Sequence, residues 1–378
     1  MGEGKDQLVL ERVGEWLDRH WKWVVLLAWL AFCAWLLNQR WGPVHAFALA
    51  DTDDNLRMAQ VRDLLRGQDW FDLRQHRLNP PAGANIHWSR LVDLPIAGLI
   101  LLLRPFVGGA SAEMAATAIA PLLPLALTLT CLALVARRLI DPRSFLLPAV
   151  VLIYAGSALG MFVPLRIDHH NWQLAFLALA MAGLADAKPA RGGMVVGLAT
   201  ALSLSIGLEM LIYLGIAAAA VTLFWVADDR ERRRLASYGI TLAGGTAFGF
   251  LLFASYDNRL AVCDALSPVW LSDALIGGAS LFILSWLSPA DWRKRLGLAV
   301  LAGGIIAVFH ALAWPSCLSR LEGFTPQAVD LWLSHVREAR PITMHGWRTA
   351  TLSLSIPSAA CWVGACWPGF VVTIARRC

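Results

Sequence analysis

Long apolar runs alternate with short polar segments along almost the whole chain. Because about 20 apolar residues carry a helix across a bilayer, we expect each long run to be a span. The pattern predicts ten spans, at residues 23–41, 113–136, 144–163, 171–186, 192–209, 210–227, 236–255, 268–288, 296–314 and 350–374. The segment 94–107 is shorter and is interrupted by two prolines and an arginine, so we predict a re-entrant or interfacial helix there.

The composition agrees with this pattern. The chain has 378 residues, of which 57% are hydrophobic and 16% are charged, whereas soluble domains carry roughly 25% charged residues. It also contains 18 tryptophans, which are typical of the two membrane–water interfaces. We therefore predict an all-α integral membrane protein. The net charge of +5 does not indicate a nucleic-acid partner, because the basic residues fall in short loops between apolar runs.

The basic residues predict the orientation of the spans. With a cytoplasmic N-terminus, the inner loops hold Arg137, Arg138, Arg143, Lys188, Arg191, Arg230, Arg232, Arg233, Arg234, Arg293, Lys294 and Arg295. The short outer loops hold little beyond Arg166 and Arg259. This distribution obeys the positive-inside rule, and counting 94–107 as a further span would reverse it. We expect a multi-pass protein of the inner (plasma) membrane.

The predicted organisation is one transmembrane domain with a short lead-in. Residues 1–22 form the cytoplasmic lead-in, and within it 8–22 is either an amphipathic helix on the inner membrane surface or a solvated segment. Residues 23–378 form the transmembrane domain. Its two long outer loops, 42–93 and 315–349, are the places where function is expected, since long ordered loops usually carry it.

Three acidic points fall on the predicted outer side. The first is Asp51-Thr52-Asp53-Asp54, at the start of the first long loop. The second is Asp168-His169-His170, in the tight turn after the run 144–163. The third is Glu338, in the second long loop. Acids near membrane depth are expensive and tend to mark a functional site, so their position on one side predicts a shared site.

Each acidic point also has a structural explanation. Asp51 and Asp54 could be a solvated helix start, because Asp caps helices. A histidine pair can simply lie at the interface, and Glu338 could pair with a neighbouring arginine, which contributes little when exposed. The functional hypothesis therefore depends on the convergence of all three points.

Carboxylates with one imidazole are suitable ligands for Mg²⁺ or Mn²⁺. Such an ion would offset the charge of a phosphate or pyrophosphate leaving group, and one carboxylate could position or deprotonate an acceptor. His87 and Arg90 of the first loop could bind the phosphate of a lipid-linked donor. Arg57 and Arg62 could do the same, although a solvated loop charge is the expectation for these two.

At these residues the chain resembles the GT-C membrane glycosyltransferases, and especially the archaeal and bacterial catalytic subunit of oligosaccharyltransferase. That family has a catalytic Asp in the first outer loop and an Asp-His-His motif after the third span, as in Asp168-His169-His170. A later outer loop carries a motif that ends in Glu, often with Pro three positions on, as with Glu338 and Pro341.

The resemblance implies roles for these residues. One Asp of the first loop, together with Asp168, His170 and Glu338, would surround a divalent metal and the acceptor. Asp53 fits the family pattern because a basic residue, Arg62, follows it by nine positions. Asp51 fits a second spacing to a basic residue. We prefer Asp53, which would orient or activate the acceptor. The family continues into further spans and a soluble outer domain, so we expect this chain to be a C-terminally shortened form.

The expected function is sugar transfer from a polyprenyl-(pyro)phosphate donor, embedded in membrane lipid, to an acceptor on the outer face. The acceptor, whether protein, polysaccharide or lipid, is not specified by the sequence. One alternative is a metal-independent transferase with a polyprenyl-monophosphate-sugar donor, in which an Asp is the general base. Another is a transporter or non-catalytic scaffold, although transporters usually show interrupted spans in paired halves, and this sequence shows no such pairing.

Overall fold

The structure is a computed structural model that describes residues 3–49, 51–318, 326–331 and 333–335. The chain divides into two units, Met1–Trp314 and Pro315–Cys378. In the second unit, α15 (Pro326–Leu331) is the only α-helix among the described residues. The helices of the first unit are α1 (Glu3–Gln39), α2 (Trp41–His45), α3 (Thr52–Leu65), α4 (Asp93–Val107), α5 (Gly109–Ile119), α6 (Leu122–Leu139), α7 (Leu147–Tyr154), α8 (Gly156–Leu159), α9 (His170–Leu184), α10 (Pro189–Ile206), α11 (Leu211–Ala227), α12 (Arg232–Phe253), α13 (Pro268–Leu287) and α14 (Trp292–Ala313).

Six helical segments among the described residues are long and apolar enough to cross a membrane. They are Gly14–Gln39, Gly109–Leu139, Pro189–Ile206, Asp229–Phe253, Pro268–Leu287 and Trp292–Ala313. A seventh span results if the helices Ser144–Tyr154 and Gly156–Phe162, bent by 87°, are counted as one. Each of these overlaps a predicted span, so the multi-pass, all-helical fold class is confirmed.

The predicted count of ten spans is not confirmed. Helix α9 has 15 residues and α11 has 17, which gives lengths of about 23 and 26 Å against a hydrocarbon core of about 30 Å. The predicted span 350–374 lies outside the described residues.

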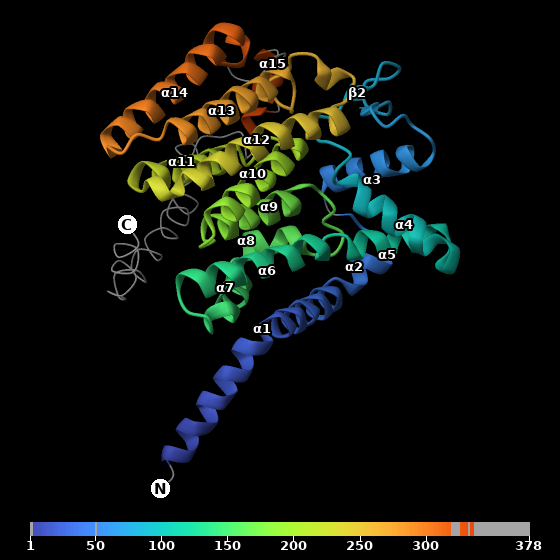
Figure 1. Ribbon diagram of the computed structural model, residues 1–378. Coiled ribbons are helices and arrows are strands. Elements are labelled where there is room, and N and C mark those ends of the chain that lie inside the picture. The colour runs from blue at the N-terminus through green and yellow to red at the C-terminus, as the bar shows by residue number, and fades with distance from the viewer. Residues whose placement is uncertain (1–2, 50, 319–325, 332, 336–378) are drawn as a thin grey trace. The chain divides into compact units, whose positions relative to one another are not determined.

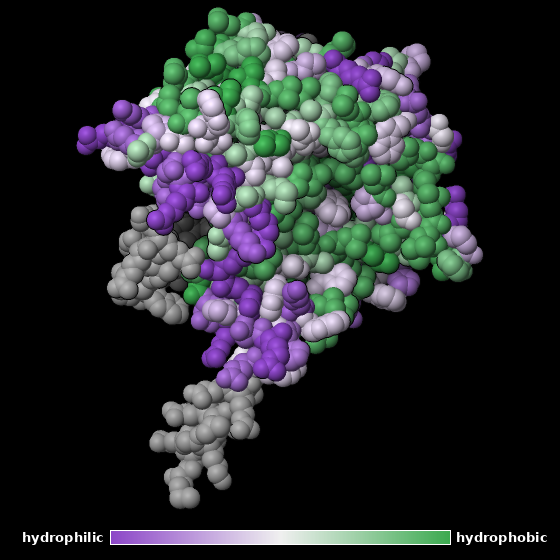
Figure 2. All heavy atoms as spheres, in the orientation of Figure 1, coloured by the Kyte–Doolittle hydropathy of each residue, from purple (hydrophilic) through white to green (hydrophobic). Residues whose placement is uncertain are grey.

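Neighbouring helices lie side by side across the first unit. Contacts link α1 to α6, α6 to α9, α9 to α10, α10 to α12, α12 to α13 and α13 to α14 (Figure 1). Apolar side chains dominate the face of this layer in Figure 2, and hydrophilic ones gather toward its edges. Large exposed apolar residues such as Ile212 and Ile216 of α11 and Val300 of α14 are suited to lipid, not water.

Helix α1 contains both the predicted lead-in and the first predicted span. It extends from Glu3 to Gln39 and is kinked at His20, which has non-helical angles (φ −109°, ψ 16°). This kink lies close to the predicted boundary between 1–22 and the first span. The lead-in is therefore helical, whereas its position on the membrane surface remains a prediction.

The predicted outer loop 42–93 is ordered. It contains α2, α3 and a small hairpin in which β1 (Arg74–Gln75) pairs antiparallel with β2 (Ala84–Asn85). Helix α4 follows and covers the segment 94–107, which confirms that this segment is helical. Its membrane depth remains a prediction.

Glycines allow α10 and α12 to pack closely, as small residues do between membrane helices. A Cβ at Gly193 would lie 2.1 Å from the carbonyl oxygen of Arg234, and one at Gly197 would lie 2.9 Å from that of Tyr238. Both contacts are with backbone, which cannot move aside as a flexible side chain can. This contact therefore depends on the absence of side chains at two positions four residues apart.

We predict that Gly193→Ala destabilises the protein by about 1–3 kcal/mol, because overpacking forces the backbones apart. Thermal unfolding of the detergent-purified protein measures the effect. The control is Gly244→Ala on α12, where a Cβ would meet nothing within 4 Å. Equal unfolding midpoints for the two variants would show that the close approach is unimportant.

Candidate metal centre and active site

Four chain segments meet at the candidate site. They are the start of α3, the stretch 87–93 before α4, the turn 166–170 before α9, and the turn 207–210 between α10 and α11. Apolar helices adjoin the last two turns: α9 follows the first, and α10 and α11 flank the second. The site is therefore built from residues distant in sequence.

The two oxygens of the Asp168 carboxylate have different surroundings. Oδ1 accepts hydrogen bonds from the backbone N–H of His169 (2.7 Å) and lies 2.6 Å from Nδ1 of the same residue. Oδ2 lies 3.0 Å from Nδ1 of His170. Both of these last atoms are buried, and neither has a hydrogen-bond partner among the described residues. The two atoms form an ion pair with each other, and Oδ2 also lies 3.6 Å from Nη2 of Arg166, so they have charged neighbours but no hydrogen bond.

This pair fits a divalent metal. Ligand atoms of Asp168, His169 and His170 lie within 4.8 Å of one another. A carboxylate oxygen and an imidazole nitrogen 3.0 Å apart could both reach one divalent cation, whose ligand distances are about 2.0–2.6 Å. A bound cation would also remove the cost of leaving two buried polar atoms without partners.

The acidic run at the start of α3 meets the Asp168 turn. Asp51 is the N-cap of α3 and accepts from the backbone N–H of Asp53 (3.1 Å), which confirms the capping explanation for Asp51. Asp54 is not a solvated cap residue, because it is 1% exposed and accepts the backbone N–H of Asp168 (3.0 Å). Arg166 bridges the two carboxylates, with contacts of 2.7 Å to Asp51 and 3.0 Å to Asp54.

Asp53 is partly buried beside this cluster. Burial, reinforced by the negative charges of Asp168 and Asp51, raises the pKa of Asp53 above that of an ordinary Asp. For Asp54, burial outweighs the opposing effect of Arg166 and raises the pKa to about 6. Burial works in the same direction on Asp168, but the contacts with the imidazoles of His169 and His170 prevail and hold its pKa well below the usual range.

His169 is held between two carboxylates. Its Nε2 lies 2.8 Å from Oε1 of Glu209, on the ring side opposite Asp168. Burial disfavours a charged ring, but the hydrogen bonds to Asp168 and Glu209 prevail and raise the pKa of His169 to about 8. The same contact overcomes burial at Glu209 and lowers its pKa to about 2.

Sequence analysis did not identify Glu209 as a site residue. It ends the predicted span 192–209, and its signal is weak: it is a single acid in the sequence Gly207-Leu208-Glu209-Met210, between two apolar runs. An acid in a tight turn on the predicted outer side is the same signal that marked Asp168. Its meaning depends on contact with His169, 40 residues earlier.

The two predicted phosphate-binding residues differ in accessibility. The side chain of His87 is 42% exposed, and its Nε2 lies 3.8 Å from Oε1 of Glu209. Arg90 has no exposed surface; its guanidinium donates to Asp93, to Gln68 and to backbone carbonyls of the same loop. In this structure Arg90 stabilises the loop, and His87 is the accessible residue of the two.

Arg57 and Arg62 are not solvated loop charges, contrary to expectation. Arg57 is completely buried, donates to Asp93 (3.0 Å) and lies over the ring of Trp88 at 4.6 Å. Arg62 pairs with Glu113 at 2.6 Å. Glu338, the third predicted acid, lies outside the described residues.

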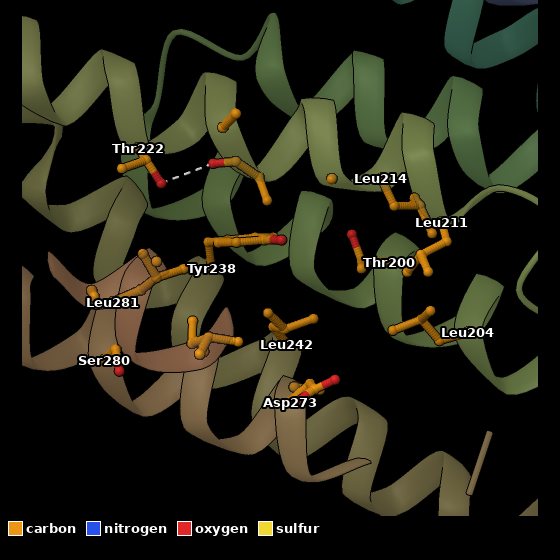
Figure 3. A pocket seen from close by; sticks show the side chains of 18 of the residues that line it. Thr200, Leu204, Leu211, Leu214, Thr222, Tyr238, Leu242, Asp273, Ser280 and Leu281 are labelled. Atoms are coloured by element: carbon orange, nitrogen blue, oxygen red, sulfur yellow. Dashed lines mark hydrogen bonds between the residues drawn. The ribbon is translucent and has the colours of Figure 1, made fainter. Parts of the chain in front are cut away.

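A largely apolar cavity of about 380 Å³ lies between helices α10 to α14. Leu204, Leu211, Leu214 and Leu242 line it together with the Tyr238 ring (Figure 3). Asp273 also lines it, and its Oδ2 lies 2.7 Å from Nδ1 of His310. Leu211, the first residue of α11, lines the cavity and follows Glu209 by two positions in the sequence.

Solved structures of one archaeal protein have a similar fold. The oligosaccharyltransferase AglB from Archaeoglobus fulgidus, solved in complex with an inhibitory peptide and a dolichol-phosphate, superposes with a TM-score of 0.58 and 15% identity over 79% of this chain and 38% of the archaeal chain. The Archaeoglobus fulgidus oligosaccharyltransferase tethered with an acceptor peptide that contains the NVT sequon gives 0.59 and 16%, over 79% and 39%. This chain shares the oligosaccharyltransferase fold.

The apo form of the Archaeoglobus fulgidus oligosaccharyltransferase gives a TM-score of 0.57 and 19% identity, over 88% of this chain and 40% of the archaeal chain. The chain therefore spans less than half the length of these oligosaccharyltransferases. No family model matches the sequence, and neither does any curated protein. At such low identity the likeness establishes the fold and not the activity, and the expected resemblance is confirmed at that level.

We predict that Asp93→Asn destabilises the protein by about 3 kcal/mol or more. The change removes the charge that compensates Arg57 and Arg90, both fully buried, and an uncompensated buried charge is costly. The matched control is Asp257→Asn, which breaks a more exposed pair with Arg74 and should leave the unfolding midpoint close to that of the wild type. Equal losses in the two variants would contradict this difference.

A second prediction concerns pH. The pKa of His169 is raised from 6.5 to about 8, so the stabilisation that its charge brings is complete below pH 6.5 and is lost as the pH rises through 8. In EDTA-treated protein, Glu209→Gln should lower the free energy of unfolding by on the order of 1 kcal/mol at pH 6. The deficit should shrink by pH 9, and a deficit that does not vary between these pH values would contradict the assignment.

Proposed function

We propose that this chain is a membrane glycosyltransferase that moves a sugar from a polyprenyl-(pyro)phosphate donor to an acceptor at the outer face of the inner (plasma) membrane. The N-terminus would be cytoplasmic, as the basic inner loops indicate. The observation that carries the proposal is the buried contact between Asp168 Oδ2 and His170 Nδ1, which lie 3.0 Å apart and make no hydrogen bond, in a fold shared with part of the oligosaccharyltransferase chains.

Asp168 and His170 would hold a divalent cation, with Asp53 and Glu338 as the further carboxylates. An oxygen-rich set with one imidazole favours Mg²⁺ or Mn²⁺. A bound cation would offset the negative charge that develops on the leaving phosphate. His87, the accessible one of the two predicted phosphate-binding residues, is the candidate contact for that phosphate.

In the transfer, an oxygen or nitrogen of the acceptor forms a bond to the anomeric carbon of the sugar. The bond from that carbon to the donor phosphate oxygen breaks, and the polyprenyl phosphate or pyrophosphate leaves with the electron pair. The proton lost by the acceptor goes to the Asp53 carboxylate.

The apolar cavity supports a lipid-linked donor. Its lining is suited to hydrocarbon, and Leu211 in its wall is two residues from Glu209 beside the candidate centre. One of the similar structures holds dolichol-phosphate, a lipid of the same chemical class.

We predict that Asp168→Asn lowers the rate of transfer at least 100-fold, because it removes the charged metal ligand. The purified protein is incubated with radiolabelled polyprenyl-linked sugars extracted from its host membrane, and the release of label from the lipid phase is measured. EDTA should abolish transfer by the wild type, and Mn²⁺ or Mg²⁺ should restore it.

The matched control is Asp141→Asn, an exposed acid in the predicted inner loop, which should transfer at the wild-type rate. Unchanged transfer by Asp168→Asn would overturn the proposed site. Transfer that resists EDTA but is lost in Asp53→Asn would point to the metal-independent transferase. If no label moves in any variant, a transporter or scaffold becomes the better hypothesis.

A further inference from the structure

We propose that Glu209 is a positioning residue of the metal centre, which fixes the ring of His169 and thereby sets the orientation of the Asp168 carboxylate. The inference rests on the proposed function in one respect, namely that a cation binds at Asp168 and His170. It adds a role for a residue that would not itself touch the cation.

The His169 ring is held at both nitrogens. Nδ1 lies 2.6 Å from Asp168 Oδ1 and Nε2 lies 2.8 Å from Glu209 Oε1. Its side chain is 2% exposed, and the ring of Trp88 lies 5.1 Å away, centroid to centroid. The ring cannot turn without breaking both contacts in a place where little water can replace them.

Glu209 is held by Gln173 of α9, and Gln173 is held by Ser203 of α10. Its Oε2 accepts from Nε2 of Gln173 (2.8 Å), which also donates to the carbonyl of Gly207 (3.2 Å). The side-chain oxygen of Gln173 accepts from the hydroxyl of Ser203 on α10. Because Gln173 is on α9, one turn beyond His169, these bonds tie the 207–210 turn to the helix that begins at the candidate centre.

This arrangement decides which oxygen of Asp168 is available. His169 occupies Oδ1, so Oδ2 is left facing Nδ1 of His170. Both carboxylate oxygens of Glu209 are already bonded, one to His169 and one to Gln173. Glu209 therefore acts through His169 and is not a cation ligand.

Without Glu209, Nε2 of His169 would be buried with no hydrogen-bond partner. The His169 ring would then turn toward a different partner. The Asp168 carboxylate would then lose its fixed orientation, and the cation would bind a less preorganised site. Loss of an outer partner that orients a metal ligand typically lowers metal affinity about 10–100-fold.

The test measures Mn²⁺ affinity of the detergent-purified 378-residue chain, after removal of metal with EDTA, from the electron paramagnetic resonance signal of free Mn²⁺. Glu209→Ala should raise the Kd about 10–100-fold. Glu209→Gln should raise it less, because the amide oxygen can still accept from His169. Glu113→Gln is the matched control, since Glu113 is a similarly accessible outer-side acid paired with one cation, Arg62; its Kd should equal that of the wild type.

A transfer assay separates positioning from general damage. In Glu209→Ala, the Mn²⁺ concentration for half-maximal transfer should rise while kcat at saturating Mn²⁺ returns to near the wild-type value. Asp168→Asn should not recover at any Mn²⁺ concentration. If Glu209→Ala does not fold, Gln173→Ala takes its place, because it frees one oxygen of Glu209 and should raise the Kd by a smaller factor.

Equal Kd values for the wild type and Glu209→Ala, with binding still lost in Asp168→Asn, would overturn this inference and leave the proposed function intact. Absence of Mn²⁺ binding in the wild type would instead overturn the metal-dependent part of the proposed function, and this inference with it. A Kd raised equally by Glu113→Gln would assign the effect to general destabilisation and would also overturn it.

Discussion

The hydrogen bond from the backbone N–H of Asp168 to the carboxylate of Asp54 joins two parts of the chain that are 114 residues apart. It brings the first predicted outer loop onto the turn before α9. Arg166 strengthens the join because it contacts Asp51 and Asp54 and also lies 3.6 Å from Asp168. The proposed site exists only because these acids meet, and opposite charge on Arg166 makes their meeting possible.

A second set of buried charges stabilises this contact between the first predicted outer loop and the turn before α9. Arg57 of α3 contacts both Asp93 and His169, and Arg90 also binds Asp93. Charges without exposed surface are tolerated only when they are paired and hydrogen-bonded. The first loop therefore cannot shift relative to α9 without separating buried ions. This constraint keeps the candidate ligands at fixed positions relative to one another. Rigid support of this kind is what a metal site needs from its surroundings.

The packing of the membrane helices determines where the turns that carry the site lie. Close packing of α10 on α12 at Gly193 and Gly197 fixes the helix that precedes the Glu209 turn. The same two helices also line the apolar cavity proposed for the lipid chain. A change in helix packing would therefore affect both the Glu209 turn and the cavity. This coupling is consistent with a donor that has an apolar chain and a charged head.

Much of the fold follows from the sequence alone. The period and length of the apolar runs predicted each of the six long spans and the helix at 94–107, because a span needs only local apolarity and length. The Asp168-His169-His170 motif and the acids at 51–54 were recognisable for a similar reason, since acids beside a span are rare. The span count was less predictable, because the length of helices such as α9 and α11 is decided by their ends.

Only the tertiary structure decided which side chains contact one another at the candidate site. Arg57 and Asp93 carry no local signal that separates a site residue from a loop charge, and that of Glu209 is weak; their roles come from contacts with His169, Trp88 and one another. Likewise, Asp51 and Asp54 are three residues apart, yet one caps a helix and the other binds the Asp168 backbone. Sequence determines which segments enter the membrane, because burial in lipid depends on composition. Which polar groups meet at their ends depends on how the helices pack, and that is a property of the whole fold.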